Sequence, residues 1–129
     1  MKEDSRQKER AAEIADAAAR ILDNKKGIDV TVLEVSGQTI LADYFVLATG
    51  TSNTHVKALT DELEFKLNEE LGITPNHIEG AEGNVWTLMD YGSVVIHVFT
   101  AQGREFYKLE RLWSGNEIKI MDGSDKDEA

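Results

Sequence analysis

Apolar residues recur with helical spacing near the start of the chain. Residues 5–26 are rich in Ala, Glu, Lys and Arg, and one stripe along them holds Ile14, Ala18, Ile21 and Leu22. This spacing predicts an amphipathic helix. Ser5 is suited to cap its start, because a short side-chain oxygen can accept from free backbone amides, and Gly27 is suited to end it.

Two β-rich stretches follow this helix. Residues 30–35 mix valine and leucine with Thr31 and Glu34, and Ser36-Gly37-Gln38 is typical of a turn. Residues 43–49 are almost continuously apolar. Because such a run suits a strand that is buried on both faces, we expect residues 43–49 in the middle of a sheet.

A second helix is predicted after the segment Gly50-Thr51-Ser52-Asn53. Apolar residues fall on one side of it, at Val56, Leu59, Leu63 and Leu67. Gly72 and Pro75 follow, and both residue types are common just beyond helix ends. We expect a loop through Glu79-Gly80 and Gly83 after this helix.

Residues 85–89 and 94–99 are two further β-rich runs, separated by Asp90-Tyr91-Gly92-Ser93. These turn residues predict an antiparallel hairpin. A two-residue Tyr91-Gly92 loop would place Trp86 opposite His97, and a three-residue loop with Gly92 in a bulge would shift that register by one. In both cases Trp86 and His97 are neighbours.

The last predicted element is a short helix, or a turn and a helix, at residues 104–113, followed at residues 123–129 by an acidic tail that we expect to be disordered. The order helix, strand, strand, helix, strand, strand, helix predicts an α/β (α+β) fold with a mixed sheet flanked by helices. We expect residues 1–122 to form a single domain.

Composition narrows the classes of function. The chain has 129 residues and a net charge of −10, so its surface should repel phosphate backbones; we expect no direct nucleic-acid binding and a basic protein as partner. It has no cysteine, which excludes disulfides and thiolate metal sites and suits the cytoplasm. Neither a signal peptide nor a membrane-spanning run is recognisable.

The strand-to-helix junction Gly50-Thr51-Ser52 is the first candidate for chemistry, because backbone amides at a helix start can hold phosphate. An ordinary helix cap needs only local geometry and is the favoured interpretation. Nucleotidyl transfer would also need paired carboxylates for a divalent metal, and no Asp-x-Asp strand follows. The histidines at 55, 77 and 97 lack metal-ligand spacing. We therefore expect no enzyme activity, cofactor or metal.

Aromatic residues are concentrated in the final third of the chain: Trp86, Tyr91, Phe99, Phe106, Tyr107 and Trp113. A single aromatic residue is most often part of a core. A cluster within and after one hairpin also suits a protein interface, since Trp and Tyr contribute much of the binding energy there. Trp86 is the preferred anchor.

The chain resembles the ribosomal silencing factors, also called the Iojap-like family. The resemblance spans about residues 11–113 and depends on the order and spacing of several short motifs. These are Asp43-Tyr44-Phe45-Val46, Thr49-Gly50-Thr51-Ser52, His55-Val56, Glu79-Gly80, Trp86, Asp90-Tyr91-Gly92, Val95-Ile96-His97-Val98-Phe99, Arg104, Tyr107 and Leu109-Glu110-Arg111-Leu112-Trp113.

This resemblance implies a fold similar to nucleotidyltransferases without their catalytic carboxylates. It also implies binding to the large ribosomal subunit through ribosomal protein L fourteen, which prevents the subunits from joining and represses translation when nutrients are scarce. The partner surface carried over from the family comprises Trp86, Met89, Tyr91, His97, Phe99, Tyr107, Leu109 and Glu110.

Other motif residues are expected to act structurally. Asp90 and Gly92 should shape the hairpin turn, while Asp43 and Thr49 should hold strand ends. Ser93 departs from the family, which usually has an acidic residue there, so a charge contact is in doubt. Two alternatives stay open: a nucleotidyltransferase-like enzyme using Gly50-Thr51-Ser52, and a homodimeric adaptor that uses the aromatic cluster without contacting the ribosome.

Overall fold

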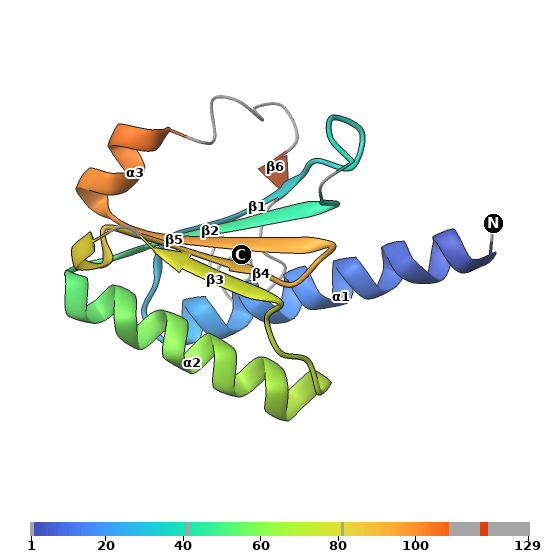
Figure 1. Ribbon diagram of the computed structural model, residues 1–129, viewed down its shortest axis with the longest axis horizontal. Coiled ribbons are helices and arrows are strands. Elements are labelled where there is room, and N and C mark those ends of the chain that lie inside the picture. Colours follow the sequence, from blue (N-terminus) through green and yellow to red (C-terminus); the bar gives the residue numbers. More distant parts are fainter. Residues whose placement is uncertain (1, 41, 81, 109–116, 119–129) are drawn as a thin grey trace, which may run out of the picture.

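The computed structural model describes residues 2–40, 42–80, 82–108 and 117–118, and shows helices on both faces of one sheet (Figure 1). Helices α1 (Lys2–Asn24) and α2 (Asn53–Leu71) cover one face, and the short α3 (Ala101–Tyr107) lies over the other. A single 3-10 turn, η1, spans Glu82–Asn84. The mixed sheet flanked by helices that the sequence predicts is confirmed.

The sheet has six strands in the order β3-β4-β5-β2-β1-β6. Their bounds are β1 Ile28–Glu34, β2 Tyr44–Gly50, β3 His77–Gly80, β4 Trp86–Asp90, β5 Val94–Thr100 and β6 Glu117–Ile118. β2 and β5 run parallel to each other, and the other neighbouring pairs of these six strands are antiparallel. The predicted central strand is confirmed, because β2 lies between β5 and β1.

The second helix begins and ends as the sequence predicts, whereas the predicted cap of the first helix at Ser5 is wrong, because Ser5 lies inside that helix. α1 begins at Lys2, three positions before the predicted Ser5, and the Gly27 amide donates to the Leu22 carbonyl just after its end. In α2 the Ser52 side chain accepts from the His55 amide at 3.1 Å, and Gly72 closes the helix with a φ of 70°. The capping interpretation of Ser52 is therefore confirmed.

The β4–β5 hairpin is confirmed, but both registers considered for it are wrong. Trp86 pairs with Phe99, and Asp90 pairs with Val95. The Tyr91 amide donates to the Val94 carbonyl at 2.9 Å, so the two loop residues are Gly92 and Ser93. Gly92 has a φ of 89°, which a type II′ turn requires at its first central residue. The loop therefore starts one residue later than expected.

Three other expectations need correction. The loop expected through Glu79-Gly80 is in fact strand β3, and β6 was not predicted at all. The last helix begins at Ala101 rather than residue 104, because the Thr100 side chain caps it by accepting from the Gly103 amide at 3.1 Å. Within the described residues it ends at Tyr107, while the predicted part at 109–113 and the tail at 123–129 lie outside them.

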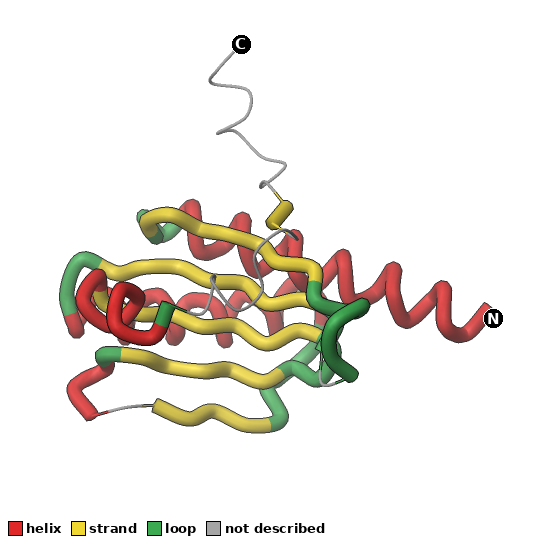
Figure 2. Tube along the Cα trace, turned by 90° about the horizontal axis from the view of Figure 1, so that it is seen from above, coloured by secondary structure: helices red, strands yellow, loops and turns green. Residues whose placement is uncertain are grey.

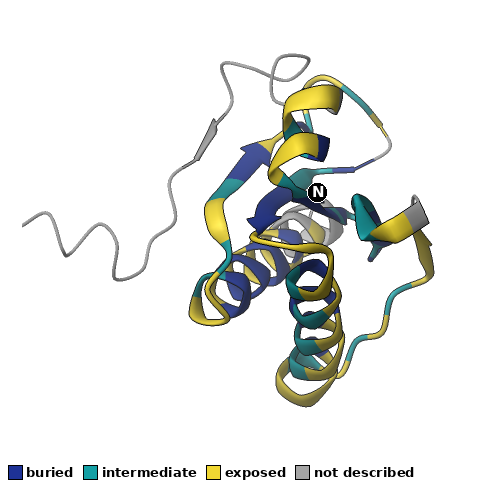
Figure 3. Cartoon of the chain, turned by 90° about the vertical axis from the view of Figure 1, so that its left-hand side faces the viewer, coloured by how far each residue is buried: buried dark blue, intermediate teal, exposed yellow. Residues whose placement is uncertain are grey.

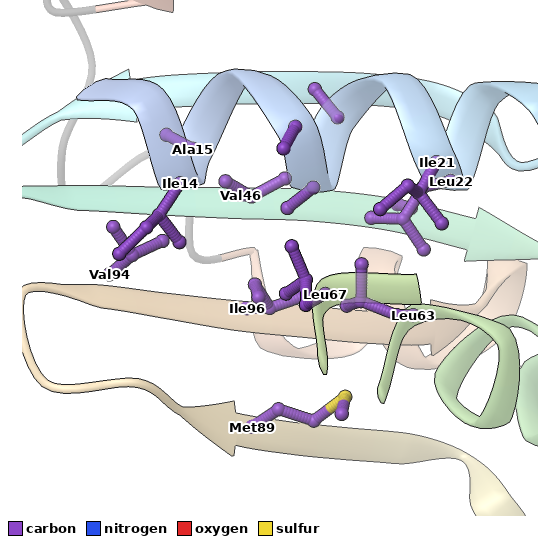
Figure 4. Packing of buried hydrophobic residues seen from close by; sticks show 14 of the residues in the cluster. Ile14, Ala15, Ile21, Leu22, Val46, Leu63, Leu67, Met89, Val94 and Ile96 are labelled. Atoms are coloured by element: carbon purple, nitrogen blue, oxygen red, sulfur yellow. The ribbon is translucent and has the colours of Figure 1, made fainter. Parts of the chain in front are cut away.

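Buried apolar residues form a cluster on each face of the sheet. The larger cluster lies between the sheet and the helices α1 and α2, where Figure 4 shows Leu63 and Leu67 of α2 beside Ile96 and Met89. The outward sides of both helices are exposed (Figure 3). Among the residues described, none of the helices is long and apolar enough to cross a membrane.

Candidate functional site

The sheet face opposite α1 and α2 is built differently from the face that they cover. Alternate residues of a strand point to opposite faces, and directly paired residues share a face. Trp86 pairs with Phe99, and Leu88 pairs with His97, so all four lie on this face. Phe45 joins them, since its ring contacts His97. We call this set, Phe45, Trp86, Leu88, Val95, His97 and Phe99, the aromatic face.

The rings of the aromatic face are stacked in an ordered array. The ring centroid of Trp86 lies 5.8 Å from that of His97 and 6.1 Å from that of Phe99, and both pairs are nearly parallel. Phe45 meets His97 edge-on, with 5.1 Å between centroids. Such stacked and edge-on pairs add to the energy of apolar burial, so each ring holds its neighbours in place.

A hydrogen bond fixes the orientation of Trp86. Its indole Nε1–H donates to Nδ1 of His97 at 3.1 Å, so the neutral imidazole carries its proton on Nε2. The side chain of His97 is only 5% exposed, and burial lowers its pKa from 6.5 to about 4. His97 is therefore neutral at pH 7. The prediction that Trp86 and His97 are neighbours is confirmed, although they lie diagonally across the β4–β5 pair and not directly opposite each other.

The residues of the aromatic face differ in exposure, and Phe45 and Val95 are half-buried on the central strands. Phe99 and His97 on β5 are buried, whereas Trp86 and Leu88 on β4 are half-buried. The outer strand β3 is exposed at every residue. Trp86 and Leu88 are thus partly exposed beside the buried rings of His97 and Phe99.

Acidic groups border this exposed part. On β3 the side chains of His77 and Glu79 contact each other, with 2.6 Å between Nε2 and Oε2. Glu79 pairs with Leu88, and His77 pairs with Asp90, so all four side chains are on the aromatic-face side. One oxygen of Asp90 accepts from the Gly92 amide at 2.7 Å, which matches its expected role in shaping the turn.

The structure divides the eight predicted partner-binding residues. Trp86, His97 and Phe99 are together on the aromatic face. Met89 and Tyr91 are 0% and 8% exposed in the cluster beneath α1 and α2, so they do not share a surface with Trp86. Tyr107 ends α3, and Leu109 and Glu110 lie outside the described residues. The binding roles of all eight residues stay a prediction.

Sequence reasoning missed two residues that border Trp86. Leu88 shares its face, which period-two alternation along residues 85–89 could have shown. Glu79 could not have been placed there, because β3 is too short and too polar to be read as a strand and its pairing with β4 is a tertiary contact.

A hollow of about 450 Å³ lies at the carboxyl ends of the parallel strands β2 and β5, a common ligand-binding position in α/β sheets. Its groups are largely engaged with one another. The Arg104 guanidinium donates to the Asp29 carbonyl at 2.7 Å and to the Thr49 hydroxyl at 3.0 Å. The Thr51 amide donates to Nδ1 of His55 at 2.8 Å. The Thr51 amide and the His55 amide, which donates to Ser52, are thus already used within the loop and the helix cap.

Side chains suited to metal binding do not gather in the described part of the chain, where no group of three or more His, Cys, Asp or Glu residues is placed to hold an ion. Thr49 and Asp43 are hydrogen-bonded at strand ends, Thr49 through its side chain and Asp43 through its backbone. Thr49 accepts from Arg104, while the Asp43 carbonyl accepts from the Val35 amide at 2.8 Å.

Comparison with known proteins connects the chain with ribosomes. A family model described as "Ribosomal silencing factor during starvation" matches residues 8–129. The ribosomal silencing factor RsfS of Halalkalibacterium halodurans is 39% identical over 111 residues, covering 86% of this chain and 94% of that protein. A mouse protein named "Mitochondrial assembly of ribosomal large subunit protein 1" is 33% identical over 102 residues, covering 77% of this chain and 44% of its own length.

A solved structure supports the same relationship. The crystal structure of a Chromobacterium violaceum protein matches this fold with a TM-score of 0.76 and 36% sequence identity. The match covers 92% of this chain and 98% of the other. The arrangement of the sheet and its helices is therefore shared with this solved protein.

Proposed function

The chain belongs to the ribosomal silencing factor family, and from this premise we propose that it binds the large ribosomal subunit through ribosomal protein L fourteen. The bound protein obstructs the small subunit, so the subunits do not join and translation is repressed. No chemical step is required, because occupying the surface is sufficient.

The single observation that carries this proposal is the exposed part of the aromatic face. Trp86 and Leu88 are half-buried, they are supported from below by His97 and Phe99, and Glu79 borders them. A central aromatic anchor with a polar rim is the usual construction of a protein interface. Residues that only fill a core would not need a stack of aromatic rings that reaches the surface, as this one does at Trp86.

Charge favours a basic partner over another acidic protein. With a net charge of −10, the chain is attracted to a basic ribosomal protein and repelled by exposed RNA phosphates. Electrostatic attraction raises the association rate, and burial of Trp86 slows release. A standard interface of about 800 Å² per partner is sufficient for specific binding. Binding should therefore weaken, without vanishing, as salt is added.

The name of one relative supports the large subunit as the target. The mouse relative is named for assembly of the mitochondrial ribosomal large subunit, and the bacterial relative is named as a silencing factor. A protein that remains on the large subunit and excludes the small one would satisfy both descriptions.

Trp86→Ala tests the anchor, with Phe65→Ala as a matched control. Phe65 is 60% exposed on α2, which covers the opposite face, so its loss removes exposed aromatic surface away from the proposed site. Truncating an anchor costs about 2 kcal/mol or more, so co-sedimentation with large subunits should weaken by about 30-fold for Trp86→Ala. Phe65→Ala should bind like the unaltered chain.

A subunit-reassociation assay completes this test. The unaltered chain and Phe65→Ala should lower the yield of joined ribosomes, and Trp86→Ala should do so only at higher concentration. Thermal unfolding must show that Trp86→Ala is folded at the assay temperature. Equal binding by both variants would remove Trp86 from the interface, and an unaltered chain that fails to bind large subunits would refute the proposed function.

A further inference from the structure

Strand β3 forms an edge of the sheet, next to the aromatic face (Figure 2). It pairs with β4 on one side, and within the described part of the chain no strand pairs with its other side. All four of its residues are exposed. An edge strand presents unpaired backbone N–H and C=O groups, which can pair with another extended segment.

We propose that an extended basic segment of the ribosomal partner adds to β3 as a further strand. This inference rests on the proposed function and specifies how the partner is held. Main-chain hydrogen bonds to the edge contribute affinity, and the side chains of β3 on each face contribute specificity.

The two faces of β3 specify the side chains that this segment should carry. His77 and Glu79 lie on the aromatic-face side, and Glu79 is an exposed carboxylate. Ile78 pairs with Met89, so it lies on the other side, where it is 46% exposed. An added strand therefore favours a cationic residue beside Glu79 and apolar residues beside Ile78. Alternating basic and apolar residues fit this edge.

The edge is continuous with the proposed anchor. Glu79 of β3 pairs directly with Leu88 of β4, and Leu88 is two residues from Trp86 on the same face. A partner strand along β3 would thus bring its neighbouring residues over Leu88 and Trp86. One partner can therefore engage the backbone edge and the aromatic face together.

The acidity of the whole chain favours a basic partner over a second copy at this edge. Pairing two β3 edges would bring together two chains that each carry a net charge of −10. Such self-repulsion keeps proteins apart, whereas a basic segment is attracted to the same edge. Four residues also offer little area to offset this repulsion in a dimer.

Hydrogen–deuterium exchange of the full chain, alone and bound to large ribosomal subunits, tests the edge directly. Strand addition should slow exchange of amides in residues 77–80 by at least about tenfold, because outward N–H groups acquire partners. If the chain binds but exchange at 77–80 is unchanged, the edge proposal is refuted and the proposed function is retained. If the chain does not bind, both are refuted.

Charge reversal supplies a second, independent test. Glu79→Lys should weaken binding to large subunits by about tenfold, and the loss should shrink in high salt. Glu9→Lys, which makes the same change at an exposed position of α1, should have little effect. Equal effects of both variants would refute a specific role for the edge. Concentration-dependent dimerisation that slows exchange at 77–80 would identify a second copy as the occupant and overturn the proposal.

Discussion

The two faces of the sheet bury residues for different purposes. Beneath α1 and α2, aliphatic residues such as Leu63 and Ile96 are wholly buried against helices. On the aromatic face, stacked rings grade from buried Phe99 to half-buried Trp86. Aliphatic packing fills volume, whereas an aromatic stack that reaches the surface orders its outermost ring for contact. The first face maintains the fold, and we infer that the second recognises a partner.

The largest expected effect in a test of this contrast concerns Met89. Its predicted role in binding disagrees with its position in the core. Its side chain is wholly buried beneath the helices. Met89→Ala should lower the free energy of unfolding by about 2–5 kcal/mol in urea titrations, because it leaves a cavity. Leu63→Ala, in the same cluster but outside the hairpin, should behave alike.

Binding measurements on these two variants separate a core role from a contact role. Both folded variants should co-sediment with large subunits as the unaltered chain does. If Met89→Ala loses binding while Leu63→Ala keeps it at equal stability, Met89 belongs to the recognition surface and the contrast between the faces fails.

The next effect is a pH dependence that arises on the aromatic face. Burial lowers the pKa of His97 from 6.5 to about 4, so the unfolded chain binds this proton more readily than the folded one. Stability from this group is complete above pH 6.5 and declines as the pH falls toward 4. The expected loss is about 3 kcal/mol.

Urea unfolding between pH 7.5 and pH 4 measures this dependence. Carboxylates also titrate in the lower part of this range, so the informative quantity is the difference between the unaltered chain and His97→Gln. The variant should show a shallower decline. Parallel curves would mean that His97 is not kept neutral by burial.

The smallest expected effect concerns Tyr91, whose hydroxyl is buried beneath the helices. No described residue provides it with a hydrogen-bond partner. Burial raises the pKa of Tyr91, so the phenol stays neutral. Tyr91→Phe removes a hydroxyl that makes no hydrogen bond with the described residues. The free energy of unfolding should therefore change by less than about 1 kcal/mol or rise slightly, as thermal unfolding would show. A loss above 2 kcal/mol would reveal a partner for the hydroxyl.

The outcome for the hairpin shows how far local patterns reach. Alternation and turn residues were enough to predict two antiparallel strands and to bring Trp86 near His97. They did not give the register, because Gly92 can be the first or the second residue of a two-residue loop, and the pairing of Tyr91 with Val94 makes it the first, which neither considered register had. Residues paired across the hairpin depend on that choice, so the partner of Trp86 was mispredicted.

The candidate site was predicted in part for the same reason. Aromatic residues revealed the anchor, since Trp86 stands out by type alone. Its acidic rim was missed, because Glu79 becomes its neighbour only through the pairing of β3 with β4. Met89 and Tyr91 were grouped with Trp86 by the family resemblance, although Met89 points to the opposite face and Tyr91 packs in the cluster beneath α1 and α2.

Local composition was sufficient for the helices, the central strand, the hairpin and the acidic character, because each depends on residues close together in the chain. The tertiary structure decided which face each strand residue joins, that β3 forms an edge, and that Thr49 is bonded by Arg104. These features depend on contacts between distant segments, and a one-residue change in register moves every side chain to the other face. The residue types in the sequence indicated a recognition surface, and the folded structure determined where on the molecule that surface lies.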